Sequence, residues 1–254
     1  MVHFVGAGCG AEDLITLRGA NQIERADVII YAGSLVNPAL LKRAKSGCRV
    51  YNSAEMTLEE VLDVIYDAEK SGLDTVRLHT GDPSLYGAIR EQIDALKENG
   101  IGYDITPGVS AFSGAAAALE AEYTLPDVSQ SLIITRAAGR TPVPERERIA
   151  SFAAHKASMA IYLSAGLTRK LQTELIEGGY AADTPAEIVY KTSWPEEKVF
   201  RCTVSTIDET AKQNGIKNTA LIVVGDFLGE EYQRSKLYDP DFETAFRKRK
   251  DDNA

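Results

Sequence analysis

Two glycine-rich segments carry the residues of this sequence that are best suited to bind a ligand. The first spans residues 3–10 (HFVGAGCG) and the second spans residues 78–87 (LHTGDPSLYG). In each, an apolar β-type stretch is followed by glycines, which serve where the backbone turns tightly or approaches a ligand. Residues 107–111 (PGVSA) repeat the design, with Ser110 able to cap a following helix. Since such turns present backbone N–H donors, we expect the three to form one ligand site.

The first turn also matches a dinucleotide-binding pattern, Gly-x-Gly-x-x-Ala, beginning at Gly6. A nicotinamide enzyme needs an acidic residue at the end of the next strand, about twenty residues on, to bind the ribose hydroxyls. That strand instead ends in Tyr31-Ala32-Gly33. The pattern therefore disfavours a nicotinamide oxidoreductase. Glycines that only tighten the turn remain the alternative to ligand binding.

Asp82 stands between Gly81 and Pro83, directly after a predicted strand. Pro83 fixes the backbone ahead of an expected helix. Asp82 could cap that helix, or it could accept hydrogen bonds from the amine or ribose of a ligand. The residues alone leave both roles open.

Four arginines cluster around the loop 136–144, which follows a predicted strand of the second half. Arg146 and Arg148 alternate with glutamates, which is typical of a solvated helix face. Arg136 and Arg140 lack acidic neighbours, and a forked guanidinium suits bidentate capture of a carboxylate. These two arginines are therefore candidates for binding a polycarboxylate substrate.

The sequence shows no arrangement typical of a protein nucleophile or a metal centre. Its three cysteines and three histidines are widely separated and lack metal-ligand spacing. The sequence also has no motif of two paired carboxylates that would indicate a general acid and a general base. This favours transfer of a group from an already activated donor, where orientation supplies much of the catalysis.

The composition indicates the compartment of the protein and the kinds of partner that it binds. The chain has 254 residues, of which 26% are charged and 44% hydrophobic, as in ordinary globular proteins. The net charge of −9 argues against a general nucleic-acid binder. An apolar run of the roughly 20 residues that cross a bilayer is missing, as is a signal-peptide pattern. We therefore expect a cytoplasmic protein with free thiols that contacts neither membrane nor nucleic acid.

Strand and helix patterns alternate through the first half, which predicts a mainly parallel sheet covered on both faces. Thr57 and Glu60 form a capping box that opens one helix. Strands are expected at 2–5, 26–31, 75–78 and 103–106, and helices at 14–26, 88–99 and 111–121. In the second half, strands are expected at 131–135, 159–163, 186–190, 199–202 and 220–224, with a helix at 207–214.

The pattern pauses at residues 123–127, and we expect a domain boundary near there. The predicted fold is therefore α/β, with an N-terminal α/β domain over 1–121 and a C-terminal α/β domain with a mixed sheet over 122–238. Residues 239–254 form a charged tail. Its basic run 247–250 is expected to be frayed, or to contact an anionic partner.

The motifs together resemble those of the tetrapyrrole methylase family over residues 2–235. The family's Gly-x-Gly-Pro-Gly turn is similar to residues 6–10, with Cys9 in place of proline. Its Gly-Asp-Pro motif corresponds to 81–83, and its Pro-Gly-x-Ser/Thr segment to 107–110. The resemblance implies two α/β domains with S-adenosylmethionine bound in a cleft between them, a tetrapyrrole substrate and a homodimer.

Within the family, four stretches resemble the precorrin-4 C-11-methyltransferases, namely residues 31–38, 79–89, 125–130 and 136–144. This implies methyl transfer to C-11 of precorrin-4 or cobalt-precorrin-4. The alternatives are a sibling enzyme acting at another ring position and a non-catalytic tetrapyrrole-binding protein. Uroporphyrinogen-type members carry a base in a Tyr-Asp-Arg-Leu stretch that has no match here, so the catalytic residue stays unassigned.

The resemblance also implies site residues. For the methyl donor these are Cys9, Thr80, Gly81, Asp82, Leu85, Ser110, Ala111, Leu163, Lys191 and Ala220. For the tetrapyrrole, the candidates are Arg136 and Arg140, chosen for their guanidinium groups as argued above, together with Tyr86. A protein-bound metal is not expected.

Overall fold

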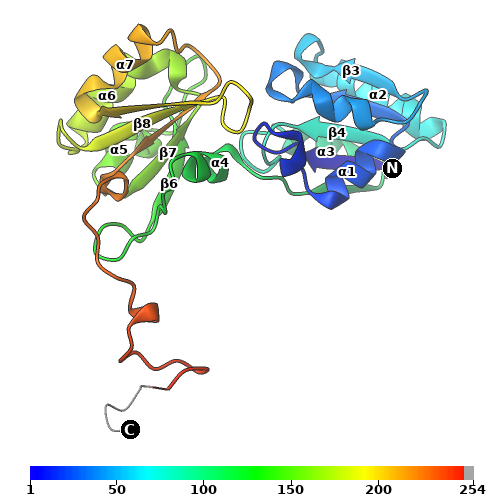
Figure 1. Ribbon diagram of the computed structural model, residues 1–254. Helices are drawn as coiled ribbons and strands as arrows, with labels where there is room; N and C mark the ends of the chain where they lie inside the picture. The colour runs from blue at the N-terminus through cyan, green and yellow to red at the C-terminus, as the bar shows by residue number, and fades with distance from the viewer. Residues whose placement is uncertain (249–254) are drawn as a thin grey trace. The chain divides into compact units, whose positions relative to one another are not determined.

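The chain forms two compact units in the computed structural model, which describes residues 1–248 (Figure 1). Unit 1 comprises Met1–Ala115 together with the short segment Lys191–Glu197. Unit 2 comprises Ala116–Tyr190 and the chain from Lys198 on. The division passes through helix α4 (Ala111–Ala118).

Unit 1 is built on a five-stranded sheet in the order β3-β2-β4-β1-β5, in which every pair is parallel. The strands are β1 (Val2–Gly6), β2 (Val28–Tyr31), β3 (Arg49–Asn52), β4 (Thr75–His79) and β5 (Tyr103–Thr106). The helices that connect them are α1 (Leu17–Arg25), α2 (Leu58–Lys70) and α3 (Arg90–Glu98). The predicted parallel sheet is confirmed.

Successive side chains of a strand point to opposite faces, and both faces of this sheet are apolar. On one face, Phe4 and Ile30 pack with residues of α2 and α3 such as Ile65. On the other face, Ile29 packs with Ile23 of α1. Helices therefore cover both sides of the sheet, as the sequence predicts.

Helix α2 begins where its capping box predicts. The Thr57 side chain accepts a hydrogen bond from the Glu60 N–H (3.3 Å), and the Glu60 carboxylate accepts one from the Thr57 N–H (2.7 Å). The capping box thus satisfies two of the backbone donors that a helix leaves open at its first turn.

Unit 2 contains a mixed sheet in the order β6-β7-β10-β8-β9, as predicted. Only β6 and β7 pair in parallel, and the other neighbours are antiparallel. The strands are β6 (Leu132–Arg136), β7 (Ser158–Tyr162), β8 (Pro185–Tyr190), β9 (Lys198–Thr203) and β10 (Ala220–Val224). The helices are α5 (Ile149–Ala153), α6 (Thr168–Glu177) and α7 (Ile207–Gln213).

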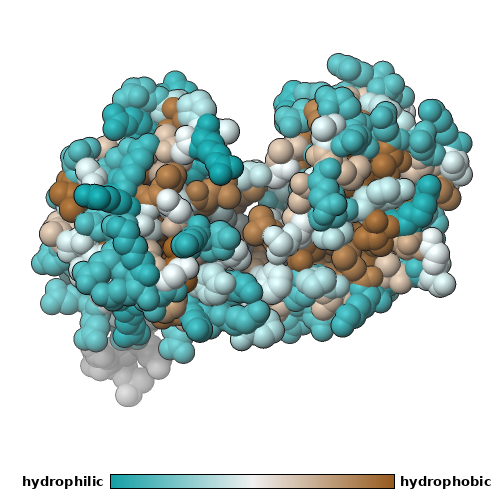
Figure 2. All heavy atoms as spheres, turned by 90° about the horizontal axis from the view of Figure 1, so that it is seen from above, coloured by the Kyte–Doolittle hydropathy of each residue, from teal (hydrophilic) through white to brown (hydrophobic). Residues whose placement is uncertain are grey.

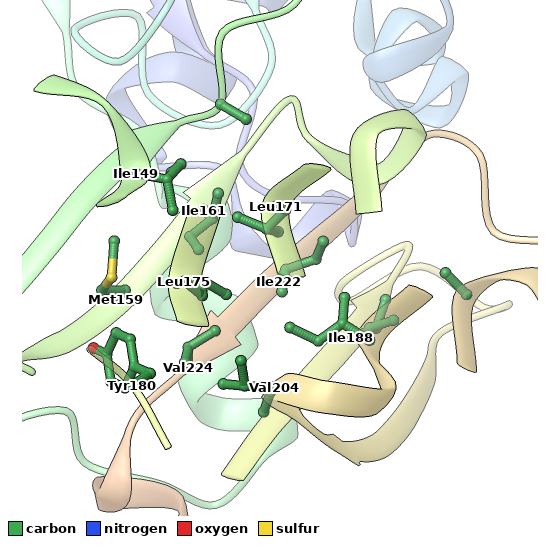
Figure 3. Packing of buried hydrophobic residues seen from close by; sticks show 14 of the residues in the cluster. Ile149, Met159, Ile161, Leu171, Leu175, Tyr180, Ile188, Val204, Ile222 and Val224 are labelled. Atoms are coloured by element: carbon green, nitrogen blue, oxygen red, sulfur yellow. The ribbon is translucent and has the colours of Figure 1, made fainter. Parts of the chain in front are cut away.

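One face of this sheet carries the hydrophobic core of unit 2 (Figure 3). Ile161 and Ile222 of neighbouring strands point toward Leu171 and Leu175 of α6. Ile149 of α5 extends the cluster. Burying one such side chain contributes roughly 1.5–3 kcal/mol to the stability of the fold. The cluster therefore holds in place the sheet that carries the loops of unit 2.

Several elements differ from the sequence prediction. Strand β3 and helices α5 and α6 were not expected, and the helix predicted from residue 14 begins at Leu17. Thr16 ends the preceding extended segment and accepts a hydrogen bond from the Gly19 N–H (3.1 Å), so the helix starts only after it. The helix predicted at 111–121 ends at Ala118.

Hydrophilic residues cover most of the face that Figure 2 shows, in keeping with the charged composition. Within residues 1–248, no helix is both long and apolar enough to cross a membrane. In the described part of the tail, Arg247 donates hydrogen bonds to the carbonyls of Leu237, Asp239 and Phe242, so this residue is not frayed as expected. Arg249 and Lys250 of the predicted basic run lie outside the described residues.

Candidate functional site

The order of strands in unit 1 creates a switch point between β1 and β4. These two strands are neighbours at the centre of the sheet, yet β1 leads to β2 on the far side of β4, and β4 leads to β5 on the far side of β1. The chain therefore leaves their carboxyl ends in opposite directions. Ligands of open α/β sheets bind at such points. The three predicted turns follow β1, β4 and β5, which are adjacent in the sheet.

Backbone hydrogen bonds join the first two turns directly. The Ala7 N–H donates to the His79 carbonyl (2.7 Å). Gly8 and Gly81 exchange a pair of bonds, 3.3 Å from Gly8 to Gly81 and 2.8 Å in return. Both glycines have positive φ, +80° and +59°, which is the region that glycine adopts at low cost. The two turns therefore behave as one rigid piece.

The third turn packs against this piece so closely that only glycine fits. A Cβ added at Gly6 would lie 2.6 Å from both the Gly108 Cα and the Gly81 carbonyl oxygen. A Cβ added at Gly108 would meet that same oxygen and lie 2.7 Å from the Gly6 Cα. Gly6 and Gly108 are thus needed for contact between turns that are distant in sequence.

Asp82 ties the second turn to the third. One carboxylate oxygen accepts hydrogen bonds from the Ser84 N–H (2.8 Å) and the Ser84 hydroxyl, and the other accepts one from the Gly108 N–H (2.8 Å). Burial opposes ionisation, but these hydrogen bonds hold the pKa of Asp82 below its usual value. Helix α3 begins only at Arg90, so the proposed cap of an immediately following helix is wrong.

Residues 83–89 form a closed loop instead of the expected helix start. A Cβ added at Gly87 would run into the Pro83 carbonyl, so the two ends of the loop touch. Tyr86 and Ala88 have positive φ, 57° and 48°, and Tyr86 is 46% exposed. Non-glycine residues in this region are strained, and such strain is concentrated at functional sites.

The predicted donor residues Thr80, Ser110 and Ala111 belong to the same edge. The Thr80 hydroxyl donates to the Leu35 carbonyl (3.0 Å), which fixes the start of the second turn. Ser110 is buried, and its carbonyl accepts the N–H groups of the first turn of α4, which begins at Ala111. A Cβ on Gly81 would lie 3.6 Å from the Ser110 Cα, an ordinary contact.

The segment Lys191–Glu197 packs on the glycine-rich first turn, which the sequence does not predict. The Ser193 hydroxyl accepts the Ala11 N–H (2.9 Å) and lies 3.3 Å from the Cys9 sulfur. A Cβ on Gly10 would meet the Trp194 ring and lie 2.8 Å from the Ser193 hydroxyl oxygen. Cys9 is therefore buried beneath this segment.

Lys191 opens that segment with a positive φ of 48°. Its ammonium group forms an ion pair with Glu196 (3.0 Å) and lies 5.5 Å from the centre of the Trp194 ring. These contacts hold the Lys191 side chain against its own segment, and the Lys191 carbonyl accepts a hydrogen bond from the Trp194 N–H (2.9 Å).

The predicted residues of unit 2 meet at one edge of the mixed sheet. Arg136 pairs with Tyr162 at the carboxyl ends of β6 and β7, and Leu163 follows Tyr162 directly. Ala220 pairs with Tyr190, at the start of β10. Leu163 is 64% exposed with a φ of 53°. An exposed, strained leucine on a loop marks this edge as a candidate ligand surface.

The two candidate arginines differ in their surroundings. The Arg136 guanidinium donates to the carbonyls of Thr141 (3.2 Å) and Pro142 (2.7 Å), so it shapes its own loop. Arg140 is exposed and has no hydrogen bond or ion pair with any residue that the structure describes. Arg148 pairs with Glu145 (3.1 Å), as expected for a solvated face.

The structure thus divides the predicted residues between the units. Unit 1 holds Cys9, Thr80, Gly81, Asp82, Leu85, Tyr86, Ser110, Ala111 and Lys191, and unit 2 holds Arg136, Arg140, Leu163 and Ala220. Over the described residues, no group of three or more His, Cys, Asp or Glu side chains could hold a metal ion.

Buried polar residues beneath the second turn were missed in the sequence. Arg77 and His79 of β4 and Gln92 of α3 are all buried. Burial lowers the pKa of Arg77 to about 10. Burial, the larger cause, and the charge of Arg77 lower the pKa of His79 to about 3. Arg77, a charged residue between Val76 and Leu78 in a predicted strand, was the available signal.

Comparisons with known proteins agree with this geometry. The family model of Tetrapyrrole (Corrin/Porphyrin) Methylases matches residues 1–208. The cobalt-precorrin-4 C(11)-methyltransferase of Methanocaldococcus jannaschii is 53% identical over 248 residues, covering 97% of this chain and 96% of that protein. The precorrin-4 C(11)-methyltransferase of Pseudomonas aeruginosa is 44% identical, covering 97% and 98%.

Solved structures give the same relationship. The X-ray structure of the cobalamin biosynthetic enzyme cobalt precorrin-4 methyltransferase, CbiF, superposes with a TM-score of 0.88 at 45% identity, covering 90% of this chain and 96% of that one. Uroporphyrin-III C-methyl transferase from Thermus thermophilus, complexed with S-adenyl homocysteine, shares the fold at 21% identity, with a TM-score of 0.77 and coverage of 89% and 98%. The fused turns at the β1–β4 switch point are therefore those of a tetrapyrrole methylase, and this chain belongs to that family.

Proposed function

We propose that this protein transfers a methyl group from S-adenosylmethionine to C-11 of precorrin-4 or cobalt-precorrin-4. The observation that carries the proposal is 53% identity over 97% of the chain to a cobalt-precorrin-4 C(11)-methyltransferase. Relatives at 45% and 44% identity are named for the cobalt and the cobalt-free substrate respectively. Both forms of the ring are therefore candidate acceptors.

The geometry of unit 1 supports a donor site at the switch point. Backbone groups around Gly81 and Ser110 would hold the polar parts of the donor, while Leu85 and Ala111 add apolar surface. Asp82 acts by shaping the turn, since its oxygens already accept hydrogen bonds from Ser84 and Gly108. Cys9 and Lys191 contribute through the backbone that Ser193 and Trp194 hold in place. Leu163 and Ala220 of unit 2 are further proposed donor-binding residues, as the family resemblance implies.

S-adenosylmethionine supplies, when bound, a methyl group on a positively charged sulfur, which is an activated donor. The chain therefore needs no nucleophile of its own. Its residues orient the acceptor and keep water from the donor, and orientation of this kind can supply most of the rate enhancement.

The acceptor carries carboxylate side chains, and Arg140 is the exposed cation suited to bind them. Tyr86, exposed on its strained loop, offers a ring face to the macrocycle. Arg136 supports Arg140 by holding the loop carbonyls of Thr141 and Pro142. We also propose that the enzyme works as a cytoplasmic homodimer, as its family resemblance implies.

The direct test mixes the purified protein with methyl-labelled S-adenosylmethionine and either precorrin-4 or cobalt-precorrin-4. We expect the product to gain the mass of one methyl group, and NMR to place the label at C-11. The same mixture with excess S-adenosylhomocysteine is the control and should show reduced transfer.

The outcomes separate the alternatives. A label at another ring carbon would identify a sibling methyltransferase. Tetrapyrrole binding without any binding of S-adenosylhomocysteine would indicate a non-catalytic carrier. A lack of transfer to either ring would refute the proposal.

A further inference from the structure

Arg77 is a buried cation without a carboxylate partner. It lies in the middle of β4 and is 7% exposed, and no acidic side chain pairs with it within the described residues. Its guanidinium instead donates to the Ile30 carbonyl of β2 (3.0 Å) and to the side-chain oxygen of Gln92 (3.1 Å). Its pKa of about 10 keeps it charged at neutral pH. A buried charge held only by neutral acceptors is costly, which suggests that it serves a purpose.

Gln92 passes this interaction on to the loop above it. Its amide nitrogen donates to the carbonyl of Ala88 (2.9 Å) while its amide oxygen accepts from Arg77. Gln92 is only 4% exposed, so water cannot readily replace either bond. Because the amide oxygen accepts the hydrogen bond from Arg77, the amide nitrogen is the group that faces Ala88. Arg77 therefore orients Gln92, and Gln92 holds Ala88.

Ala88 closes the far end of the loop that carries the candidate donor residues. It has a φ of 48°, a conformation that alanine adopts only when its surroundings enforce it. The near end of the same loop is held by Asp82 through Ser84 and Gly108. Between these two anchors lie Leu85 and the strained Tyr86. The loop is thus clamped at both ends, once by a carboxylate and once by the Arg77–Gln92 pair.

We propose that Arg77 and Gln92 are positioning residues for methyl-donor binding, acting through the Ala88 carbonyl on the loop 83–89. The inference rests on the proposed function, because it takes this loop as part of the donor site. It predicts that donor affinity depends on the buried hydrogen bond from the Gln92 amide to the Ala88 carbonyl.

The substitution Gln92→Glu separates positioning from stability. The new carboxylate keeps an acceptor for Arg77 and adds an ion pair, but it has no N–H to donate to Ala88 and would repel that carbonyl. We expect a melting temperature close to that of the wild type, with the dissociation constant of S-adenosylhomocysteine, measured by calorimetry, raised about tenfold, which is typical for loss of one buried hydrogen bond. We also expect faster hydrogen exchange over residues 83–89.

Two further variants complete the design. Gln92→Met removes both hydrogen bonds and should weaken binding to a similar degree while lowering the melting temperature, so it carries the binding test if Gln92→Glu does not fold. Gln213→Glu makes the same chemical change on the exposed face of α7 and is the matched control. It should leave binding and exchange unchanged.

The results test the positioning role of Gln92 and the proposed function separately. If Gln92→Glu binds S-adenosylhomocysteine as tightly as the wild type, or if its loop exchanges no faster, the positioning role is refuted. If the wild type itself fails to bind S-adenosylhomocysteine, the proposed function is refuted, and the exchange data alone decide whether Gln92 holds the loop.

Discussion

His79 is a buried imidazole whose Nε2 atom has no hydrogen-bond partner among residues 1–248. Its ring stacks on Phe4, with the two ring centres 6.1 Å apart. Burial and the neighbouring charge of Arg77 lower its pKa to about 3, so it stays neutral in the folded protein across the physiological range. In acid, the unfolded chain therefore binds a proton at His79 that the folded protein does not bind, which lowers the free energy of unfolding.

We predict that His79 makes the protein sensitive to acid. Between its unfolded pKa of about 6.5 and its folded value, only the unfolded state binds this proton, so stability falls as the pH falls, by up to about 1.4 kcal/mol per unit. His79→Phe keeps the stacking and removes the titration. Chemical denaturation at several pH values should therefore give a shallower loss of unfolding free energy for His79→Phe from pH 6.5 downwards.

The exposed His155 provides the control for this experiment. His155→Gln should leave the pH dependence as it is in the wild type. A His79→Phe profile parallel to that of the wild type would show that this imidazole titrates alike in both states.

At the scale of elements, the site depends on contact between turns that the sheet brings together. Gly6 ends β1, while Gly81 and Gly108 lie in the loops after β4 and β5, and their backbones touch because these strands are adjacent. Side chains at two of these positions would separate the turns. The glycines thus build the site even where they bind nothing themselves.

We predict that Gly108→Ala destabilises the protein by about 1–3 kcal/mol, as overpacking does, and lowers its affinity for S-adenosylhomocysteine. The added Cβ would collide with the Gly81 carbonyl and the Gly6 Cα. Gly102→Ala is the matched control, because a Cβ there meets no atom within 4 Å. Thermal unfolding and calorimetry on both variants check this. Equal behaviour of the two would contradict close packing of the turns.

The sequence predicts those elements that have a strong local pattern. Apolar β-branched runs marked β2 and β10, and the Thr57 capping box marked α2, because these signals depend on neighbouring residues only. The half-exposed edge strand β3 and the short helix α5 lack such patterns and were missed.

The candidate site, like the fold, could be predicted only where it depends on local sequence patterns. The three turns could be placed at one sheet edge because each directly follows a strand of a predicted parallel sheet. The packing of Ser193 on Ala11 could not, since it joins positions 182 apart and depends on the path of the whole chain. The role of Asp82 also needed the structure, because its partner Gly108 belongs to another turn.

At the scale of the whole molecule, a protein with a net charge of −9 must bind a substrate that carries several carboxylates. General electrostatic attraction cannot help, so local cations must. The loop after β6 offers two arginines, but Arg136 is engaged by carbonyls of its own loop. We therefore expect Arg140 to bind carboxylates of the substrate.

We predict that Arg140→Ala raises the KM for the tetrapyrrole about tenfold, since a charge-assisted hydrogen bond contributes about 1.5–3 kcal/mol, without changing the melting temperature. Arg136→Ala should also lower the melting temperature, because it leaves loop carbonyls without their donor. Arg146→Ala, on an exposed side chain, is the control. Steady-state kinetics and thermal unfolding measure both effects. An unchanged KM in Arg140→Ala would exclude this arginine from substrate binding.

The segment Lys191–Glu197 belongs to unit 1 although it is encoded between β8 and β9 of unit 2. The polypeptide therefore crosses between the units three times, and a single cut in the gene cannot separate them. A fragment ending at Ala115 would encode all five strands of the parallel sheet but lack Ser193 and Trp194, which pack on the glycine-rich turn. Engineering that swaps units between relatives must therefore transfer this seven-residue segment together with the first 115 residues.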